Sequence, residues 1–133
     1  MAGNTPNFLA HAGLGDLMSR YVDMDKVPWV DSRPGVRNKV LYMNKEEKQA
    51  VILSEVSPGA EIVDHFHTGL EMTYVLEGRL EDDEGVCEAG NFVWRPAGSR
   101  HQARAPEGAL FLAFFQGSSK TVETGHLFPD FEN

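Results

Sequence analysis

The 133-residue sequence has a single cysteine and little positive charge. Because Cys87 is alone, no disulfide can form within the chain, and cysteine usage does not mark an oxidising compartment. The 12 lysines and arginines are scattered and are outnumbered by 20 acidic residues, which gives a formal net charge of -8. Phosphate binding would require a clustered basic surface, so this charge argues against a nucleic-acid partner.

Long hydrophobic runs are also missing. The longest strongly apolar run, Ala109 to Phe115, is far shorter than the roughly 20 residues that a membrane-spanning helix requires. Met1 to Pro6 is small and polar, and Asp16 interrupts the segment that follows, which is unlike a secretory signal. We therefore expect a cytoplasmic protein that has no membrane partner.

Length and composition predict one domain. The chain lies in the usual size range of a single domain, and its 41% hydrophobic and 24% charged residues are typical of a globular protein. We expect residues 1–133 to form one unit, with an N-terminal arm over 1–34, a core over about 35–117 and a C-terminal tail over 118–133. The turn-rich Ser32 to Gly35 marks the first boundary.

Short runs rich in valine, leucine, tyrosine and phenylalanine follow Gly35, and glycine and proline separate them. The runs are Lys39 to Met43, Ala50 to Val56, Met72 to Leu76, Phe92 to Trp94 and Ala109 to Phe115. Many short strands at this spacing predict an all-β sandwich or barrel.

The strongest local charge run, Glu81 to Glu84, comes directly before Gly85. It lacks the alternating ligand spacing of a calcium loop, and a hairpin turn is expected at the glycine. We interpret the whole run as a solvated turn.

His65 and His67 are the most informative residues of the sequence. Alternate residues of a strand point to the same face, so these two imidazoles can bind one ion. Together with Glu71 and His101 they form a candidate metal site. Three imidazoles and one carboxylate suit one divalent transition metal per chain, namely Fe(II), Mn(II), Zn(II), Ni(II) or Cu(II), and disfavour Ca(II) or Mg(II). Two alternatives remain: His65 as a surface residue, and Glu71 as a hydrogen-bond acceptor that orients an imidazole.

The same alternation predicts the surroundings of the site. If Glu71 points inward, Thr73 and Val75 do so too, and if His101 points inward, Ala103 and Ala105 follow. We expect these four small or medium side chains to line a substrate pocket beside the ligands, and we assign no catalytic residue beyond the ligands themselves.

Two segments resemble the motifs of the cupin superfamily, G-x5-H-x-H-x3-E-x6-G and G-x5-P-x-G-x2-H-x3-N. The first runs from Gly59 to Gly78 and the second from Gly90 to His101, and only the final asparagine is replaced, by Ala105. The resemblance implies a double-stranded β-helix, or jelly-roll, barrel that holds His65, His67, Glu71 and His101 as ligands.

From about Trp29 to Gln116 the sequence is similar to the cupin branch that contains acetylacetone-cleaving dioxygenases and ChrR-type anti-sigma factors. The first precedent implies an Fe(II)-dependent oxidoreductase that uses O2 to cleave a carbon–carbon bond of a small diketone or hydroxyketone. The second implies a zinc-binding, noncatalytic sensor or small-molecule binding module. The first thirty-odd residues contain one histidine and no cysteine, unlike a helical sigma-binding domain with its own zinc ligands, so we favour the enzyme.

The sequence also suggests self-association. Small barrels present exposed strands, and the tail carries Phe128 and Phe131 on a polar background. We expect a homodimer.

Overall fold

The computed structural model describes residues 17–132, so the first sixteen residues of the predicted arm lie outside the described residues. The described chain contains one short 3-10 helix, η2 (Met24–Lys26), and otherwise strands and turns. The strands are β1 (Val30–Arg33), β2 (Val36–Asn44), β3 (Gln49–Val56), β4 (Glu61–His67), β5 (Glu71–Glu81), β6 (Val86–Glu88), β7 (Phe92–Arg95), β8 (Arg100–Arg104), β9 (Ala109–Gln116), β10 (Ser119–Thr121) and β11 (Leu127–Phe128).

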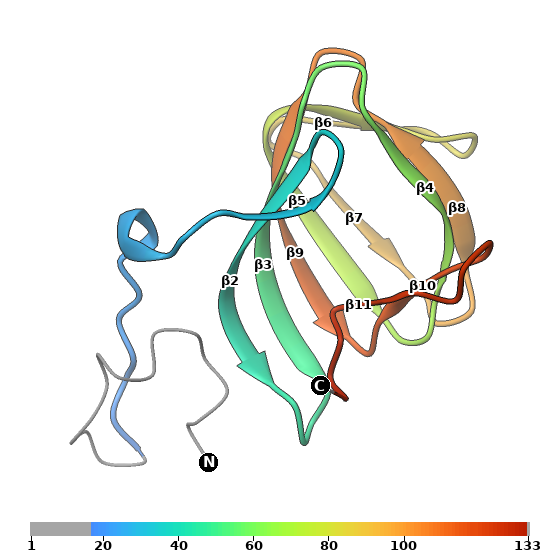
Figure 1. Cartoon of the computed structure of the whole chain (residues 1–133). Helices are drawn as coiled ribbons and strands as arrows, with labels where there is room; N and C mark the ends of the chain where they lie inside the picture. The colour runs from blue at the N-terminus through green and yellow to red at the C-terminus, as the bar shows by residue number, and fades with distance from the viewer. Residues whose placement is uncertain (1–16, 133) are drawn as a thin grey trace.

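One curled, antiparallel sheet contains all of these strands. Their order is β1-β2-β3-β9-β5-β8-β4-β10-β11, with β6 and β7 also paired to β5. The curl places β2, β3 and β9 across from β4 and β8, with the interior between them (Figure 1). This arrangement confirms the predicted all-β jelly-roll fold.

Alternating side chains make the inner face apolar. In β9, Ala109, Phe111, Ala113 and Phe115 are buried, and each intervening residue is more exposed. This period of two is what a strand with one face on the core requires. No helix in the described part of the chain is long and apolar enough to cross a membrane.

Strand β5 joins the two halves of the sheet. Its first part, from Glu71 to Gly78, pairs with β9, whereas Glu81 at its end pairs with Arg104 of β8. Gly78 lies near the crossing with a φ of 71°, and a β-carbon there would lie 2.0 Å from the carbonyl oxygen of Gly108. Only glycine fits this close approach, which accounts for the motif glycine.

The predicted arm and tail both add strands to the sheet. Residues of β1 pair with β2, so the sheet begins at Val30, before the expected boundary at residue 35. In the tail, β10 pairs with β4 and places Ser119 opposite His67. The aromatic residues of the tail pack within the chain: Phe131 is buried in the core, and the ring of Phe128 meets that of Phe115 edge to face. Phe131 is therefore part of the core, whereas Phe128 is only partly buried.

Candidate metal centre

Two neighbouring strands bring three histidines together. His65 and His67 lie on the inner face of β4, and His101 lies on β8, directly opposite His65 in the strand register. His65 is 6% exposed and His67 only 1%. One nitrogen from each of the three rings lies within 4.8 Å of the others, so the strands form a cluster that can hold a metal ion.

The Nδ1 atom of each ring contacts a protein oxygen, and two of the Nε2 atoms have no partner among the described residues. His65 Nδ1 lies 2.7 Å from the carbonyl oxygen of Val63, and His101 Nδ1 lies 3.1 Å from Oδ2 of Asp82. His67 Nδ1 lies 3.4 Å from the Ser119 hydroxyl. The Nε2 atoms of His67 and His101 are buried and have no hydrogen-bond partner among the described residues. Rings that donate through Nδ1 present the Nε2 lone pair to a metal.

Burial keeps these rings neutral. It lowers the pKa of His67 to about 3, with a further contribution from the neighbouring imidazoles of His65 and His101. Burial also lowers the pKa of His101, to about 4, and reduces that of His65. Neutral imidazole is the form that binds metals, so at neutral pH protons do not compete with the ion.

Asp82 departs from the predicted solvated turn. Its side chain is only 4% exposed, and Oδ2 accepts a hydrogen bond from His101 and forms an ion pair with Arg95, whose Nη1 lies 2.9 Å away. Its other oxygen accepts the backbone N–H groups of Glu84 and Gly85 at 2.8 and 3.0 Å. The prediction was wrong for this residue because the aspartate caps its own hairpin and so turns inward.

A signal for Asp82 is present in the sequence. Aspartate two and three residues before two turn amides is the pattern of an Asx turn, which fixes the carboxylate against the backbone. Asp83 and Glu84 are exposed, as predicted. What the sequence does not reveal is that the hairpin folds back toward His101.

The environment of Asp82 favours the carboxylate. Burial raises its pKa, but the backbone N–H groups of Glu84 and Gly85 and the positive charge of Arg95 more than offset this, so the pKa is lowered overall. A charged acceptor behind His101 holds that ring in the orientation and tautomer that a metal ligand needs.

Glu71 lies at the edge of the histidine cluster and is not one of its three members. Its Oε2 is 4.0 Å from Nδ1 of His67, and its Oε1 accepts a hydrogen bond of 3.3 Å from the Thr73 hydroxyl. The contact of the carboxyl group with His67 is therefore at Nδ1. The cause lies in the topology: Glu71 begins β5, which pairs with β7 and β9 at this end, and not with the strands that carry the histidines. Burial raises its pKa to about 7.

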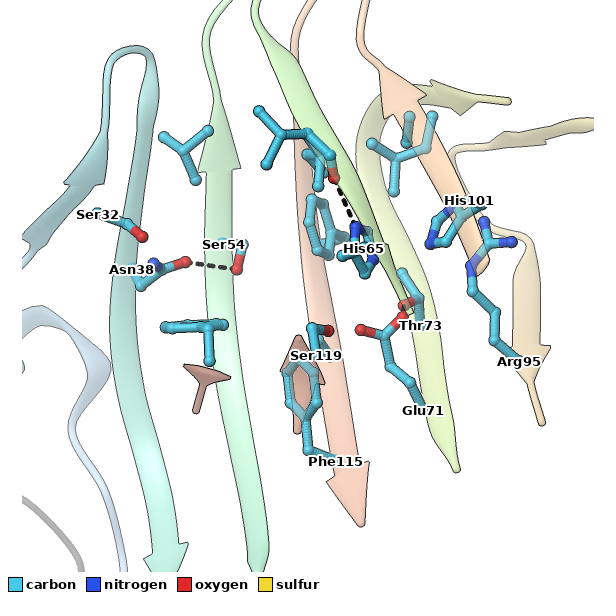
Figure 2. A pocket seen from close by; sticks show the side chains of 18 of the residues that line it. Ser32, Asn38, Ser54, His65, Glu71, Thr73, Arg95, His101, Phe115 and Ser119 are labelled. Atoms are coloured by element: carbon cyan, nitrogen blue, oxygen red, sulfur yellow. Dashed lines mark hydrogen bonds between the residues drawn. The ribbon is translucent and has the colours of Figure 1, made fainter. Parts of the chain in front are cut away.

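A cavity of about 100 Å³ opens beside the histidines. His65, His101, Glu71 and Arg95 line it together with apolar side chains, and Figure 2 shows these polar groups along one wall. The other apolar members of the lining include Ile62, Phe111, Ala113 and Phe115.

The four side chains expected around the pocket divide into two pairs. Thr73 and Ala103 line the cavity, and both are almost fully buried. Val75 and Ala105 also point inward, but they lie in the packed core and are not among the lining residues. Alternation gives the correct face of each strand, but not the position along the strand at which the cavity ends. Ala105, at the position of the motif asparagine, therefore fills core space rather than widening the pocket.

Comparisons with known proteins agree with this architecture. Residues 18–120 match the model of the ChrR cupin-like domain family. A proposed acetylacetone dioxygenase from Methylibium petroleiphilum PM1 has a similar structure, with a TM-score of 0.75 and 21% identity over 85% of this chain and 88% of that chain. An acetylacetone dioxygenase from Acinetobacter johnsonii gives a TM-score of 0.73 and 17% identity over 84% of this chain and 83% of that chain.

A third similar structure is the Rhodobacter sphaeroides complex of SigE with the anti-sigma ChrR. The TM-score is 0.61 and the identity 26%, over 69% of this chain and 50% of that chain. No curated protein matches the sequence.

Proposed function

The chain belongs to the ChrR cupin-like domain family, and on that premise we propose that it is a mononuclear metal-dependent dioxygenase that cleaves a carbon–carbon bond of a small diketone or hydroxyketone. The observation that carries the proposal is the cluster of three neutral imidazoles, two buried and one partly buried, beside a largely apolar cavity. The fold-level likeness to two acetylacetone dioxygenases supports it by analogy.

The residues present fit a divalent transition metal. His65, His67 and His101 supply three nitrogen donors, and two of their Nε2 atoms are buried without a protein partner. Nitrogen donors suit Fe(II), Zn(II), Mn(II) or Ni(II) better than Ca(II) or Mg(II). Bound there, one Fe(II) ion per chain would supply a Lewis acid and a site for O2.

The proposed reaction needs no external reductant. A β-diketone and O2 give a carboxylic acid and a 1,2-dicarbonyl compound; one carbon–carbon bond breaks, both oxygen atoms enter the products, and the substrate provides all four electrons. The protein positions the reactants and excludes water. Ile62, Phe111 and Phe115 form the apolar lining that does so, and Asp82 keeps the His101 ring in place.

Metal analysis followed by oxygen uptake tests the proposal. Protein purified without added metal is analysed by mass spectrometry for its metal content, then depleted and reloaded with Fe(II) under anaerobic conditions. We expect oxygen consumption with at least one member of a panel of β-diketones and α-hydroxyketones, in a one-to-one ratio with substrate cleaved. Fully loaded protein that consumes no oxygen with any of them would overturn the proposed activity.

A second candidate function is a zinc-binding, noncatalytic sensor module. The match to the ChrR cupin-like family and the 26% identity to a chain of the SigE–ChrR complex favour it. It predicts zinc in the purified protein and no oxygen consumption after reloading with Fe(II). The same experiment therefore separates the two candidates.

A homodimer is a further part of the proposal. Large apolar side chains are exposed on the outer face of β5 and β7, where Tyr74 pairs directly with Phe92 and Trp94 is 60% exposed. A second copy covering this face would remove these rings from water. Light scattering after size exclusion should give twice the chain mass, and Trp94→Glu should give the monomer; a monomeric wild type would contradict the dimer.

A further inference from the structure

An arginine of β1, Arg33, forms part of the cavity wall. It is partly buried, yet its side chain forms no ion pair or hydrogen bond with any other described residue. Its positive charge makes a small contribution to the lowered pKa of His65. By contrast, carboxylates pair with Arg37, Arg79, Arg95, Arg100 and Arg104.

The unpaired state of Arg33 is unexpected in this chain. Acidic residues outnumber basic ones by 20 to 12, so carboxylates to pair with it are plentiful. A guanidinium that is partly withdrawn from water and left without an anion loses hydration without compensation. Such a group is suited to receive an anion from outside the chain, most strongly a planar carboxylate.

A second free donor lies on the neighbouring strand. Asn38 is 5% exposed and lines the cavity, and its Oδ1 accepts a hydrogen bond of 2.6 Å from the Ser54 hydroxyl (Figure 2). This bond assigns the amide oxygen to the protein and leaves the Nδ2 group with no acceptor among the described residues. Arg33 pairs with Val36, and Asn38 is the next residue of β2 on the same face. The two donors therefore belong to one wall.

This wall lies across the cavity from the metal centre. Asn38 and Ser54 are on β2 and β3, whereas His65 and His101 are on β4 and β8, and Figure 2 shows the two groups apart, with apolar side chains between them. Glu71 is the only carboxylate among the described lining residues, and it lies at the histidine end, near His67. No acidic group therefore opposes an anion at the far end.

We propose that the cavity takes an anionic substrate, whose carbonyl oxygens face the histidines and whose carboxylate is held by Arg33 and Asn38. The inference that the substrate has carbonyl groups rests on the proposed function. The inference that it has a carboxylate rests on the two donors, Arg33 and Asn38. A neutral diketone would leave both donors unpaired, which costs binding free energy. The site thus distinguishes keto acids from simple diketones.

Two compounds of equal length test the proposal. 4,6-Dioxoheptanoate and heptane-2,4-dione share the diketone and differ in a terminal carboxylate against a methyl group. Their dissociation constants are measured by titration calorimetry on metal-loaded, full-length protein without oxygen. A charge-assisted, two-point contact should make the carboxylate bind about tenfold or more tightly than the neutral compound.

Variants of Arg33 test whether this residue causes the preference for the carboxylate compound. Arg33→Gln should bring the two dissociation constants to within about twofold of each other by weakening the carboxylate alone, and Arg33→Lys should restore part of the difference. Arg100→Gln is the matched control, because Arg100 is an exposed arginine bound to Asp64 and lies outside the cavity lining. It should keep the full preference. Unchanged circular dichroism and metal content would establish that Arg33→Gln is folded.

The outcomes separate this inference from the proposed function. Equal affinity of the two compounds in the wild type, no binding of either, or a preference that survives Arg33→Gln would overturn the anionic substrate. Preferential binding of the carboxylate without oxygen consumption in the presence of Fe(II) would support the substrate class and count against the dioxygenase.

Discussion

The two ends of strand β5 each bring a carboxylate to the histidine cluster, and the two groups differ in almost every respect. At the start of the strand, Glu71 has one hydrogen bond, from Thr73, and burial raises its pKa to about 7. Just beyond the other end, Asp82 accepts hydrogen bonds from two backbone N–H groups and from His101, and it forms an ion pair with Arg95. Its pKa is lowered. Both side chains are largely buried, at 12% and 4% exposure.

Burial raises the pKa of both groups, and the surrounding donors and positive charge reverse that effect at Asp82 only. Removing a carboxylate from water disfavours the ionised form, and only hydrogen bonds or positive charges at the site can reverse that effect. Asp82 has enough of them to stay ionised and to hold the His101 ring, whereas Glu71 does not. At neutral pH, Asp82 in the turn is therefore more firmly held as a carboxylate than Glu71, the residue that the motif marks as a ligand.

Removing the His101 ring, which is hydrogen-bonded to Asp82, should have the largest effect on metal binding. His101→Ala deletes one of three nitrogen donors, so bound metal should fall below a tenth of the wild-type content, and the loss of affinity should exceed the roughly 10- to 100-fold typical of an outer partner. The metal-dependent rise in melting temperature should disappear with it. Metal content by mass spectrometry and thermal unfolding check both effects, and wild-type metal content in this variant would rule out the histidine site.

Asp82→Asn tests the end of β5 where the carboxylate is ionised. The amide leaves the buried guanidinium of Arg95 without its main anion, which should lower the free energy of unfolding by about 3 kcal/mol. Metal affinity should fall by roughly 10- to 100-fold, because the His101 ring loses its acceptor. Denaturant unfolding and metal titration measure the two effects.

The matched control is Asp64→Asn. Asp64 also pairs with an arginine and directly precedes His65, but it is partly exposed and, by strand alternation, points to the opposite face from His65. Its replacement should leave metal affinity unchanged. Equal losses in the two aspartate variants would mean that Asp82 has no special role.

Much of this site follows from the sequence, and the rest depends on long-range structure. Strand alternation places His65 and His67 on one face, and the motif spacing selects His101. The role of Asp82 is not evident because an acidic run before a glycine is typical of a solvated turn, and its contact with His101 depends on β5 crossing between the two halves of the sheet. Arg33 is missed for a similar reason: it belongs to the predicted arm, which becomes a cavity wall only when β1 pairs with β2.

Glu71→Gln tests the other end of β5 in the metal-free protein through pH. The unfolded carboxyl has a pKa near 4.5 and the folded one about 7, so its contribution to stability is present below pH 4.5 and is lost as the pH rises through 7. His67 and His101 have lowered pKa values and act in the opposite direction. At low pH they bind protons more readily in the unfolded state, which destabilises the fold, and this loss disappears as the pH rises toward 6.5.

The variant removes the first contribution and keeps the second. Its free energy of unfolding should therefore rise more steeply between pH 5 and 8 than that of the wild type, and should exceed it by about 2 to 3 kcal/mol at pH 8. Urea unfolding at several pH values measures this difference. Parallel curves for the two proteins would show that Glu71 is ionised in the folded state at neutral pH.

X-ray absorption at the metal edge tests the central claim most directly, because it counts the ligands of the bound ion in the wild type and in Glu71→Gln. If three imidazoles hold the metal and Glu71 stands behind His67, both proteins should contain one ion per chain with the same three nitrogen donors and the same oxygen shell. Loss of one oxygen ligand, or of the ion itself, in Glu71→Gln would make the glutamate a ligand and contradict the division of roles between the two ends of β5.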